Sequence, residues 1–271
     1  MADSKAEASS DVSVGFKIIL RDYQRRMVQA WRDSKFGTEE KYKNLIEISE
    51  GDIFEGAPSV DAIVSPANSF GFMDGGIDMV YTVFFGWQMS ERLKEVIKSE
   101  HNGELLVGNA IIIPAYSPDT DLESLKIDSS ICEGKPIHYL ISAPTMRVPT
   151  DVSDTMNSYL AFRAVLLAVM SHNKSCSQKG AEPIRSVMCP GLGTAVGRMP
   201  FVRCAEQMVA AYETVVSQSL VEFISPQSLM EPVIRHRHLI TVGKDKALGS
   251  KPSPGEMFVP KNNRTEDSES D

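Results

Sequence analysis

Short apolar runs alternate along the chain with longer stretches in which apolar side chains recur every three or four residues. The short runs predict strands over residues 16–20, 44–48, 61–65, 110–114, 137–142 and 184–188. The longer stretches predict helices over residues 22–33, 77–99, 157–171 and 200–217. This alternation is typical of an α/β domain, in which a mostly parallel or mixed central sheet is covered by helices on both faces.

The two ends of the chain depart from this pattern. Residues 1–14 and 244–271 are polar, charged or rich in Ser and Pro, and they have little apolar surface to bury. Such segments cannot offset the entropy lost on ordering, so we expect a flexible N-terminal tail and a flexible C-terminal tail. Residues 15–243 are then expected to form a single α/β domain.

Composition limits the kinds of partner. The 271 residues carry a formal net charge of −8, and 42% of them are hydrophobic, which is enough for a globular core. An acidic chain is a poor candidate for neutralising the phosphates of nucleic acid, so nucleic acid is not an expected partner. Backbone N–H groups and helix N-termini can hold a small anion without any cation, so an anionic ligand remains open.

The cysteines and the first ten residues indicate the cellular compartment in which the protein is expected. The four cysteines form no CxxC pair, which favours free thiols in a reducing compartment over a disulfide framework. The first ten residues resemble neither a secretory signal nor an Arg-rich transit peptide, and no apolar run approaches the ~20 residues of a membrane span. We therefore expect a cytoplasmic or nuclear protein with no membrane partner.

One glycine-rich segment, residues 62–78, follows a predicted strand and leads into a predicted helix. Gly75 and Gly76 would allow the backbone to approach a ligand, and the next helix would present free N–H groups to an anion. Asn68 and Asp78 are the polar side chains of interest in it. The plainer interpretation is a glycine turn in which Asp78 is simply the helix N-cap.

A second glycine-rich segment, residues 188–200, also joins a predicted strand to a predicted helix. Gly191, Gly193, Thr194 and Gly197 could form another phosphate cradle. The segment is neither a Walker loop nor a GxGxxG motif. Two such loops in one α/β domain nevertheless indicate a ligand that bears phosphate.

The sequence gives little support for a metal site or for nucleophilic catalysis. The five histidines show no metal-ligand spacing, and no GxSxG nucleophile motif is present. Cys189 has no histidine nearby in the sequence to activate it. We expect neither a metal nor a cofactor.

Taken together, these segments resemble the macrodomain family, an ADP-ribose-binding α/β module. The resemblance covers about residues 44–217. It rests on segments that occur in the family's order, namely Gly-Asp-Ile at 51–53, Ile-Val-Ser-Pro-Ala-Asn at 63–68, Gly-Gly-Ile-Asp at 75–78, the strand 137–142 and Pro-Gly-Leu-Gly-Thr-Ala-Val-Gly at 190–197.

The resemblance implies roles for the matching residues. Asp52 would accept a hydrogen bond from the adenine amino group, beside the backbone of Ile53. In hydrolytic members, the residues that match Asn68 and Asp78 position the distal ribose and the attacking water. The remaining expected ligand-binding residues line the two glycine loops and are Ala67, Gly75, Gly76, Gly191, Gly193, Thr194 and Gly197.

The chain also departs from the family pattern. Met73 and Asp74 stand where hydrolases of this family commonly continue a glycine run, and Asp74 adds negative charge near the expected phosphates. Ala195 stands where a glycine is expected. The Gln-Glu-Glu signature of poly(ADP-ribose) glycohydrolases is absent, so cleavage of long polymers is not expected.

Three functions follow from these observations. The first is a protein that binds ADP-ribose and hydrolyses mono-ADP-ribosyl esters or a related derivative such as ADP-ribose 1″-phosphate, with the water held by Asp78 and Asn68. The second is a non-catalytic reader of ADP-ribosylated partner proteins. The third is an interaction protein that works through its tails without a ligand. The oligomeric state is not predicted.

Overall fold

The computed structural model describes residues 15–243, so both predicted tails lie outside the described residues. A six-stranded sheet runs in the order β2-β1-β6-β3-β5-β4. Neighbouring strands are parallel except at one edge, where β4 is antiparallel to β5. The strands are β1 (Lys17–Asp22), β2 (Ile46–Glu50), β3 (Ala62–Ser65), β4 (Ile111–Pro114), β5 (Tyr139–Ser142) and β6 (Ser186–Cys189).

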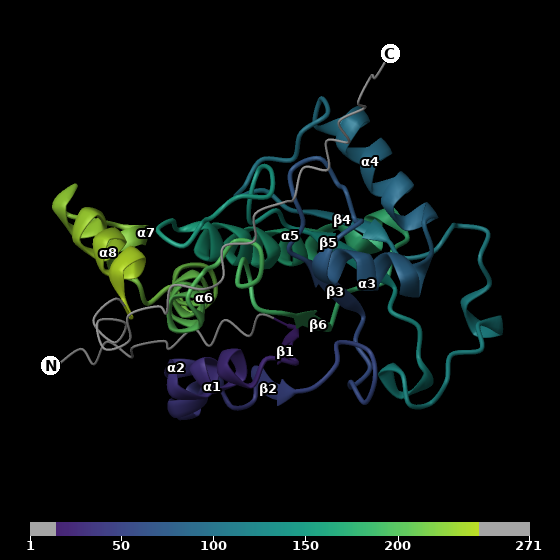
Figure 1. The fold of residues 1–271 in the computed structure, drawn as a ribbon, viewed down its shortest axis with the longest axis horizontal. Helices are drawn as coiled ribbons and strands as arrows, with labels where there is room; N and C mark the ends of the chain where they lie inside the picture. Colours follow the sequence, from purple (N-terminus) through teal and green to yellow (C-terminus); the bar gives the residue numbers. More distant parts are fainter. Residues whose placement is uncertain (1–14, 244–271) are drawn as a thin grey trace, which may run out of the picture.

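Helices lie between β1 and β2, between β3 and β4 and between β5 and β6, and three more follow β6 among the described residues (Figure 1). The helices are α1 (Arg25–Asp33), α2 (Lys35–Thr38), α3 (Gly76–Phe85), α4 (Gln88–Glu100), α5 (Asn157–Lys179), α6 (Phe201–Val215), α7 (Val221–Ile224) and α8 (Met230–Thr241). Short 3₁₀ turns at Glu40–Tyr42, Leu122–Ser124 and Cys132–Gly134 lie in the connections. The predicted α/β class with a mixed sheet is confirmed.

Successive strand residues point to opposite faces of the sheet, and helices cover both faces, so side chains of both sets are buried. Ile18 and Leu20 of β1 belong to a core cluster with α1, α5 and α6, whereas Ile19 between them belongs to a second cluster with α3 and α4. Strand β3 divides in the same way, with Val64 on the first face and Ile63 on the second. The result is a three-layer arrangement in which two helical layers enclose the sheet.

Several predicted elements differ from the structure in their bounds, and two of these differences concern the helices after β3 and the end of β1. The single helix predicted over residues 77–99 is wrong, because Gly86 adopts φ +88° and ends α3 before α4 begins. Strand β1 continues beyond its apolar run to Asp22, since Arg21 and Asp22 still pair with Ser49 and Glu50 of β2. This extension places two charged side chains at the carboxyl end of a central strand.

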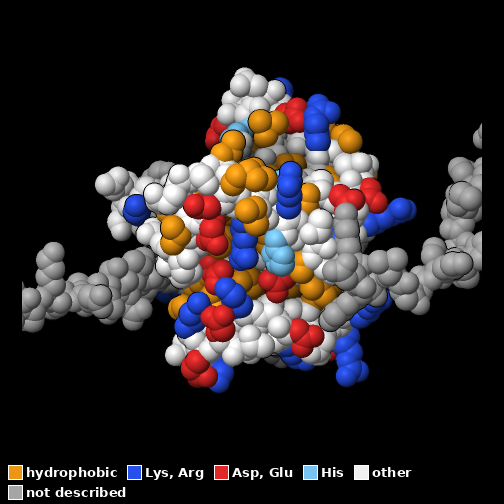
Figure 2. Space-filling model, turned by 90° about the vertical axis from the view of Figure 1, so that its left-hand side faces the viewer, with side chains coloured by type: hydrophobic (Ala, Val, Ile, Leu, Met, Phe, Trp, Pro, Cys, Tyr) orange, Lys and Arg blue, Asp and Glu red, His pale blue; other side chains and the backbone are white. Residues whose placement is uncertain are grey.

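Helix α8 was not predicted. It buries Leu239, but Met230 and Ile234 are largely exposed, so the helix has no continuous apolar stripe to reveal it in the sequence. Figure 2 views the molecule from the left-hand side of Figure 1, the side on which α7 and α8 lie, and hydrophobic, basic and acidic side chains are mixed there. His236 and His238 of α8 are both exposed.

Three further observations concern the described part of the chain. No helix within residues 15–243 has the length and apolar character needed to cross a membrane. No group of three or more His, Cys, Asp or Glu side chains in these residues could hold a metal ion. The four cysteines are free and buried.

Candidate functional site

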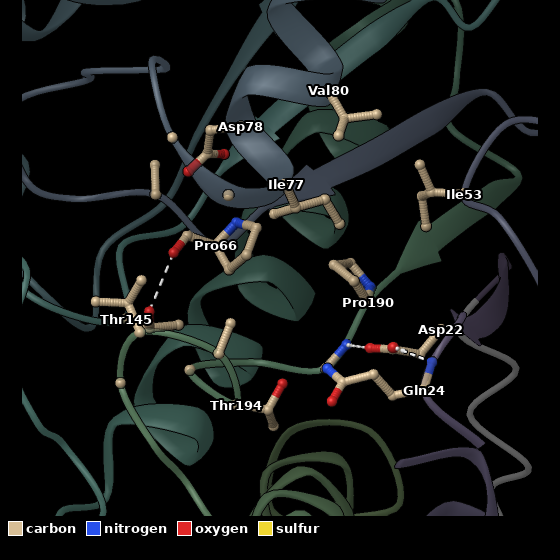
Figure 3. A pocket seen from close by; sticks show the side chains of 18 of the residues that line it. Asp22, Gln24, Ile53, Pro66, Ile77, Asp78, Val80, Thr145, Pro190 and Thr194 are labelled. Atoms are coloured by element: carbon tan, nitrogen blue, oxygen red, sulfur yellow. Dashed lines mark hydrogen bonds between the residues drawn. The ribbon is translucent and has the colours of Figure 1, made fainter. Parts of the chain in front are cut away.

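A cavity of about 590 Å³ opens where the loops after β1, β2, β3 and β6 meet, at the carboxyl ends of these parallel strands (Figure 3). In an open α/β sheet this edge is the usual place for a ligand. The cavity brings together all the residues to which the sequence assigned a role. These are Asp52, Ile53, Ala67, Asn68, Gly75, Gly76, Asp78, Gly191, Gly193, Thr194 and Gly197.

Asp52 follows β2, has an exposed side chain and lines the cavity. Its Oδ1 accepts hydrogen bonds from the backbone N–H groups of Phe54 (2.8 Å) and Glu55 (2.9 Å). No described residue donates a hydrogen bond to Oδ2. The turn therefore fixes the carboxylate while leaving one oxygen able to accept a hydrogen bond from a ligand, beside the buried Ile53.

The first glycine loop leads into the N-terminus of α3. The Thr82 hydroxyl anchors it by donating a hydrogen bond to the carbonyl of Met73 (2.6 Å). Gly76 adopts φ +57°, a left-handed conformation that favours glycine, and a Cβ atom at Gly75 or Gly76 would meet no atom within 4 Å. The helix has no side-chain cap, so its first N–H groups remain available to an anion.

The second glycine loop lies opposite. The N–H group of Gly191 donates to Oδ2 of Asp22 (3.0 Å), and the carbonyl of Gly193 accepts from the N–H group of Met199 (2.9 Å). A Cβ atom at Gly197 would lie 2.6 Å from the carbonyl oxygen of Gly193, so only glycine fits this close approach. The N–H groups of residues 193–197 donate to no described residue. Such a run of free N–H groups suits an anion.

The Asn68 side chain is largely used by its own loop. Its Oδ1 accepts from the backbone N–H groups of Phe70 (3.0 Å) and Phe72 (3.3 Å), and its Nδ2 donates to the carbonyl of Phe72 (2.8 Å). A carboxamide has two N–H groups, so one remains for a ligand. Asn68 therefore shapes the loop as well as lining the cavity.

Asp78 lies in the first turn of α3 and is buried, with its side chain against the end of β3. Its Oδ1 accepts a hydrogen bond from the Ser65 hydroxyl (2.6 Å). The pKa of Asp78 is raised to about 7, mainly by burial and to a lesser extent by the negative charge of Asp74, while the bond from Ser65 opposes the rise. The N-cap of α3 is Gly75, so the interpretation of Asp78 as the helix cap is wrong.

The balance of charge in the cavity is unusual for an anion site. Four carboxylates line it, those of Asp22, Asp52, Asp74 and Asp78, and Arg21 is the only Lys or Arg side chain among the described lining residues. A carboxyl group with a pKa near 7 loses this charge as the pH falls below neutrality. Backbone N–H groups would therefore supply most of the attraction for an anion.

Several lining residues were not predicted. Asp22 ends β1, Tyr23 and Gln24 follow it, and Thr145 and Met146 follow β5. Tyr23 is 75% exposed, so its ring is free to pack on a ligand. The Thr145 hydroxyl donates to the carbonyl of Pro66 (3.0 Å) and ties the loop after β5 to the loop after β3 (Figure 3). Only the strand order, which periodicity does not reveal, brings these residues to the cavity.

Comparison with protein-family models and with curated proteins found no match. Comparison with solved structures found similarity to the macrodomain of Mycobacterium tuberculosis DarG, with 16% identity, coverage of 62% of this chain and 90% of that chain, and a TM-score of 0.43. A mutant of the Oceanobacillus iheyensis macrodomain with ADPR shows 18% identity, coverage of 59% and 73%, and a TM-score of 0.39. The macrodomain of Thermus aquaticus DarG shows 18% identity, coverage of 58% and 83%, and a TM-score of 0.38. These solved structures are macrodomains, which is the family that the sequence of this chain resembles.

Proposed function

We propose that this chain binds ADP-ribose in the cavity and hydrolyses mono-ADP-ribosyl esters or a related derivative such as ADP-ribose 1″-phosphate. The observation that carries the proposal is the meeting of two glycine loops with Asp52 and Asp78 around one cavity. Its volume of about 590 Å³ lies within the ~300–1,000 Å³ of ordinary ligand sites.

Each part of the ligand has a matching group in the proposed complex. The adenine amino group donates to Oδ2 of Asp52, and the exposed ring of Tyr23 offers an apolar face near the base. The diphosphate lies between the free N–H groups of residues 193–197 and the N-terminus of α3. The distal ribose then lies against Asn68 and Asp78.

Hydrolysis would use Asp78 as the base. The oxygen of a water molecule bonds to the anomeric carbon of the distal ribose while the bond from that carbon to the ester oxygen breaks. The carboxylate of the modified residue leaves, and Asp78 takes a proton from the water. A base with a pKa of about 7 is suited to this proton transfer at neutral pH.

A second function, a non-catalytic reader of ADP-ribosylated proteins, is favoured by the geometry of Asn68. Its carboxamide already holds the loop through Phe70 and Phe72, which leaves a single N–H group for the ribose. Asp78 is also buried and bound to Ser65. A site built for binding alone would need no more than this.

One experiment separates these functions. The full chain is incubated with polypeptides that carry ADP-ribose on glutamate through an ester bond, and with ADP-ribose 1″-phosphate, and the products are identified by mass spectrometry. Affinity for ADP-ribose is measured by calorimetry on the same samples.

Hydrolysis predicts products with the wild-type chain and a loss of about 100-fold or more in Asp78→Asn, with ADP-ribose affinity largely kept. Asp119→Asn makes the same chemical change at an exposed loop residue and should leave turnover unchanged. Binding without any product would favour the reader. A flat titration would reject both functions and leave the interaction protein.

A further inference from the structure

Arg21 and Asp22, the last two residues of β1, lie between the strands that lead into two of the loops around the cavity. Strand β1 lies between β2, which leads into the loop of Asp52, and β6, which leads into the second glycine loop. These two loops, which both line the cavity, therefore flank the same strand end. Both side chains are buried, with exposures of 6% for Arg21 and 7% for Asp22.

Arg21 reaches toward the loop of Asp52. Its Nε donates to the carbonyl of Asp52 (2.6 Å), and its Nη2 donates to the carbonyl of Glu55 (3.1 Å). Its Nη1 donates to the hydroxyl of Ser49 (3.1 Å). A Cβ atom at Gly51 would lie 2.4 Å from Nη2, so the loop closes tightly on the guanidinium.

The partners of Arg21 are all neutral. Within residues 15–243, no carboxylate lies within ion-pair distance of its guanidinium. Burying a cation without an ion-pair partner is costly, so the three hydrogen bonds of Arg21 are what offset this cost. These bonds join β1 to Ser49 in β2 and to Asp52 and Glu55 in the loop that follows β2, so Arg21 holds the first part of this loop.

Asp22 reaches toward the second glycine loop. Its Oδ2 accepts from the N–H group of Gly191 (3.0 Å), and its Oδ1 accepts from the N–H group of Gln24 (2.8 Å) (Figure 3). A Cβ atom at Gly191 would lie 2.9 Å from Oδ2, so a larger residue would push the carboxylate and the loop apart. Both carboxylate oxygens are needed as acceptors, because each receives a backbone N–H group.

We propose that Arg21 and Asp22 are positioning residues that set the separation between the two halves of the ligand site. Arg21 holds the loop of Asp52, which recognises the base, and Asp22 holds the second glycine loop, which recognises the diphosphate. The identity of the ligand in this inference rests on the proposed function. The two halves of the site should therefore respond separately to substitution.

Titration of the full chain with ADP-ribose and with adenosine tests this separation. Asp22→Asn replaces one carboxylate oxygen by an NH₂ group, so the N–H group of either Gly191 or Gln24 loses its partner, and the bond that stays is no longer charge-assisted. The hold of Asp22 on the second glycine loop weakens in both cases. We expect ADP-ribose affinity to fall at least tenfold and adenosine affinity to change less than twofold. Arg21→Lys keeps the charge but cannot reach three acceptors, so affinity for both ligands should fall by a similar factor.

Amide hydrogen exchange without ligand gives an independent measurement. Asp22→Asn should speed exchange at the amides of Gly191 and Leu192, which have hydrogen-bond partners in this loop, and leave residues 51–56 unchanged. Arg21→Lys should do the reverse. Asp119→Asn and Arg237→Lys, at exposed positions, serve as matched controls. If Asp22→Asn does not fold, Gly191→Ala perturbs the same hydrogen bond and should show the same selective loss of ADP-ribose affinity.

The outcomes are distinguishable. A wild-type chain that binds no ADP-ribose rejects the proposed function, while the exchange data still test the positioning role. A wild-type chain that binds ADP-ribose, with equal losses for adenosine and ADP-ribose in Asp22→Asn, overturns the inference. Faster exchange throughout the domain in either variant would show a general structural role and would overturn it as well.

Discussion

The buried carboxyl group of Asp78 predicts a measurable cost in stability. Burial raises its pKa from an ordinary 3.8 to about 7, so the folded protein binds a proton that the unfolded chain has already released at intermediate pH. Because the folded-state pKa is the higher one, the contribution of Asp78 to stability is complete below pH 3.8. It is lost as the pH rises toward 7.

The magnitude follows from the two pKa values. A rise from 3.8 to about 7 corresponds to about 4 kcal/mol, lost at about 1.4 kcal/mol per pH unit. Asp78→Asn removes the ionisation but keeps an oxygen to accept the Ser65 hydroxyl. The stability of this variant minus that of the wild type should increase from pH 4 to pH 7 and stay constant at higher pH.

Urea unfolding of both proteins at intervals between pH 4 and pH 8.5 measures this difference directly. Asp119→Asn, with its exposed side chain, should show no comparable increase. A stability difference between Asp78→Asn and the wild type that does not change over this range would refute the argument that burial controls the ionisation of Asp78. A stability difference that stops increasing already near pH 4, the ordinary pKa of an aspartate, would refute it equally.

Three further changes have expected outcomes. Asp74→Asn removes the negative charge that raises the pKa of Asp78, so the pH above which that stability difference becomes constant should fall below 7. Gly76→Ala places a side chain at φ +57° and should lower unfolding stability by about 1 kcal/mol, measured in urea. Glu213→Gln disrupts a buried carboxylate that accepts from Lys35 Nζ (2.7 Å) and should cost about 2 kcal/mol in the same assay. An unchanged midpoint in either unfolding experiment would contradict its prediction.

The elements with a strong local pattern were predicted correctly. The helix that begins at Asn157 is present, and so are the strands around Val64 and Val187, because each carries enough apolar side chains to mark a buried face. Elements without such a pattern were missed or misplaced. Helix α8 exposes Met230 and Ile234, and the break at Gly86 depends on a backbone angle that hydrophobic periodicity does not record.

The glycine loops were visible in the sequence because their composition departs from that of ordinary connections. Gly75, Gly76, Gly191, Gly193 and Gly197 all line the cavity. Their roles toward ADP-ribose stay predictions, as do those of Asn68 and Asp78. Local composition could not show how the Asn68 and Asp78 side chains are hydrogen-bonded and buried in the fold. Hydrogen bonds occupy Asn68, and burial raises the pKa of Asp78.

The sequence by itself determined the class of the fold, because period and length in each segment decide whether it buries one face as a helix or two faces as a parallel strand. Only the tertiary structure decided which strands are neighbours, since that choice depends on contacts between segments far apart in the chain. It placed β1 between β2 and β6. As a result, Arg21 and Asp22, which end an otherwise apolar run, contact the two loops that enclose the cavity.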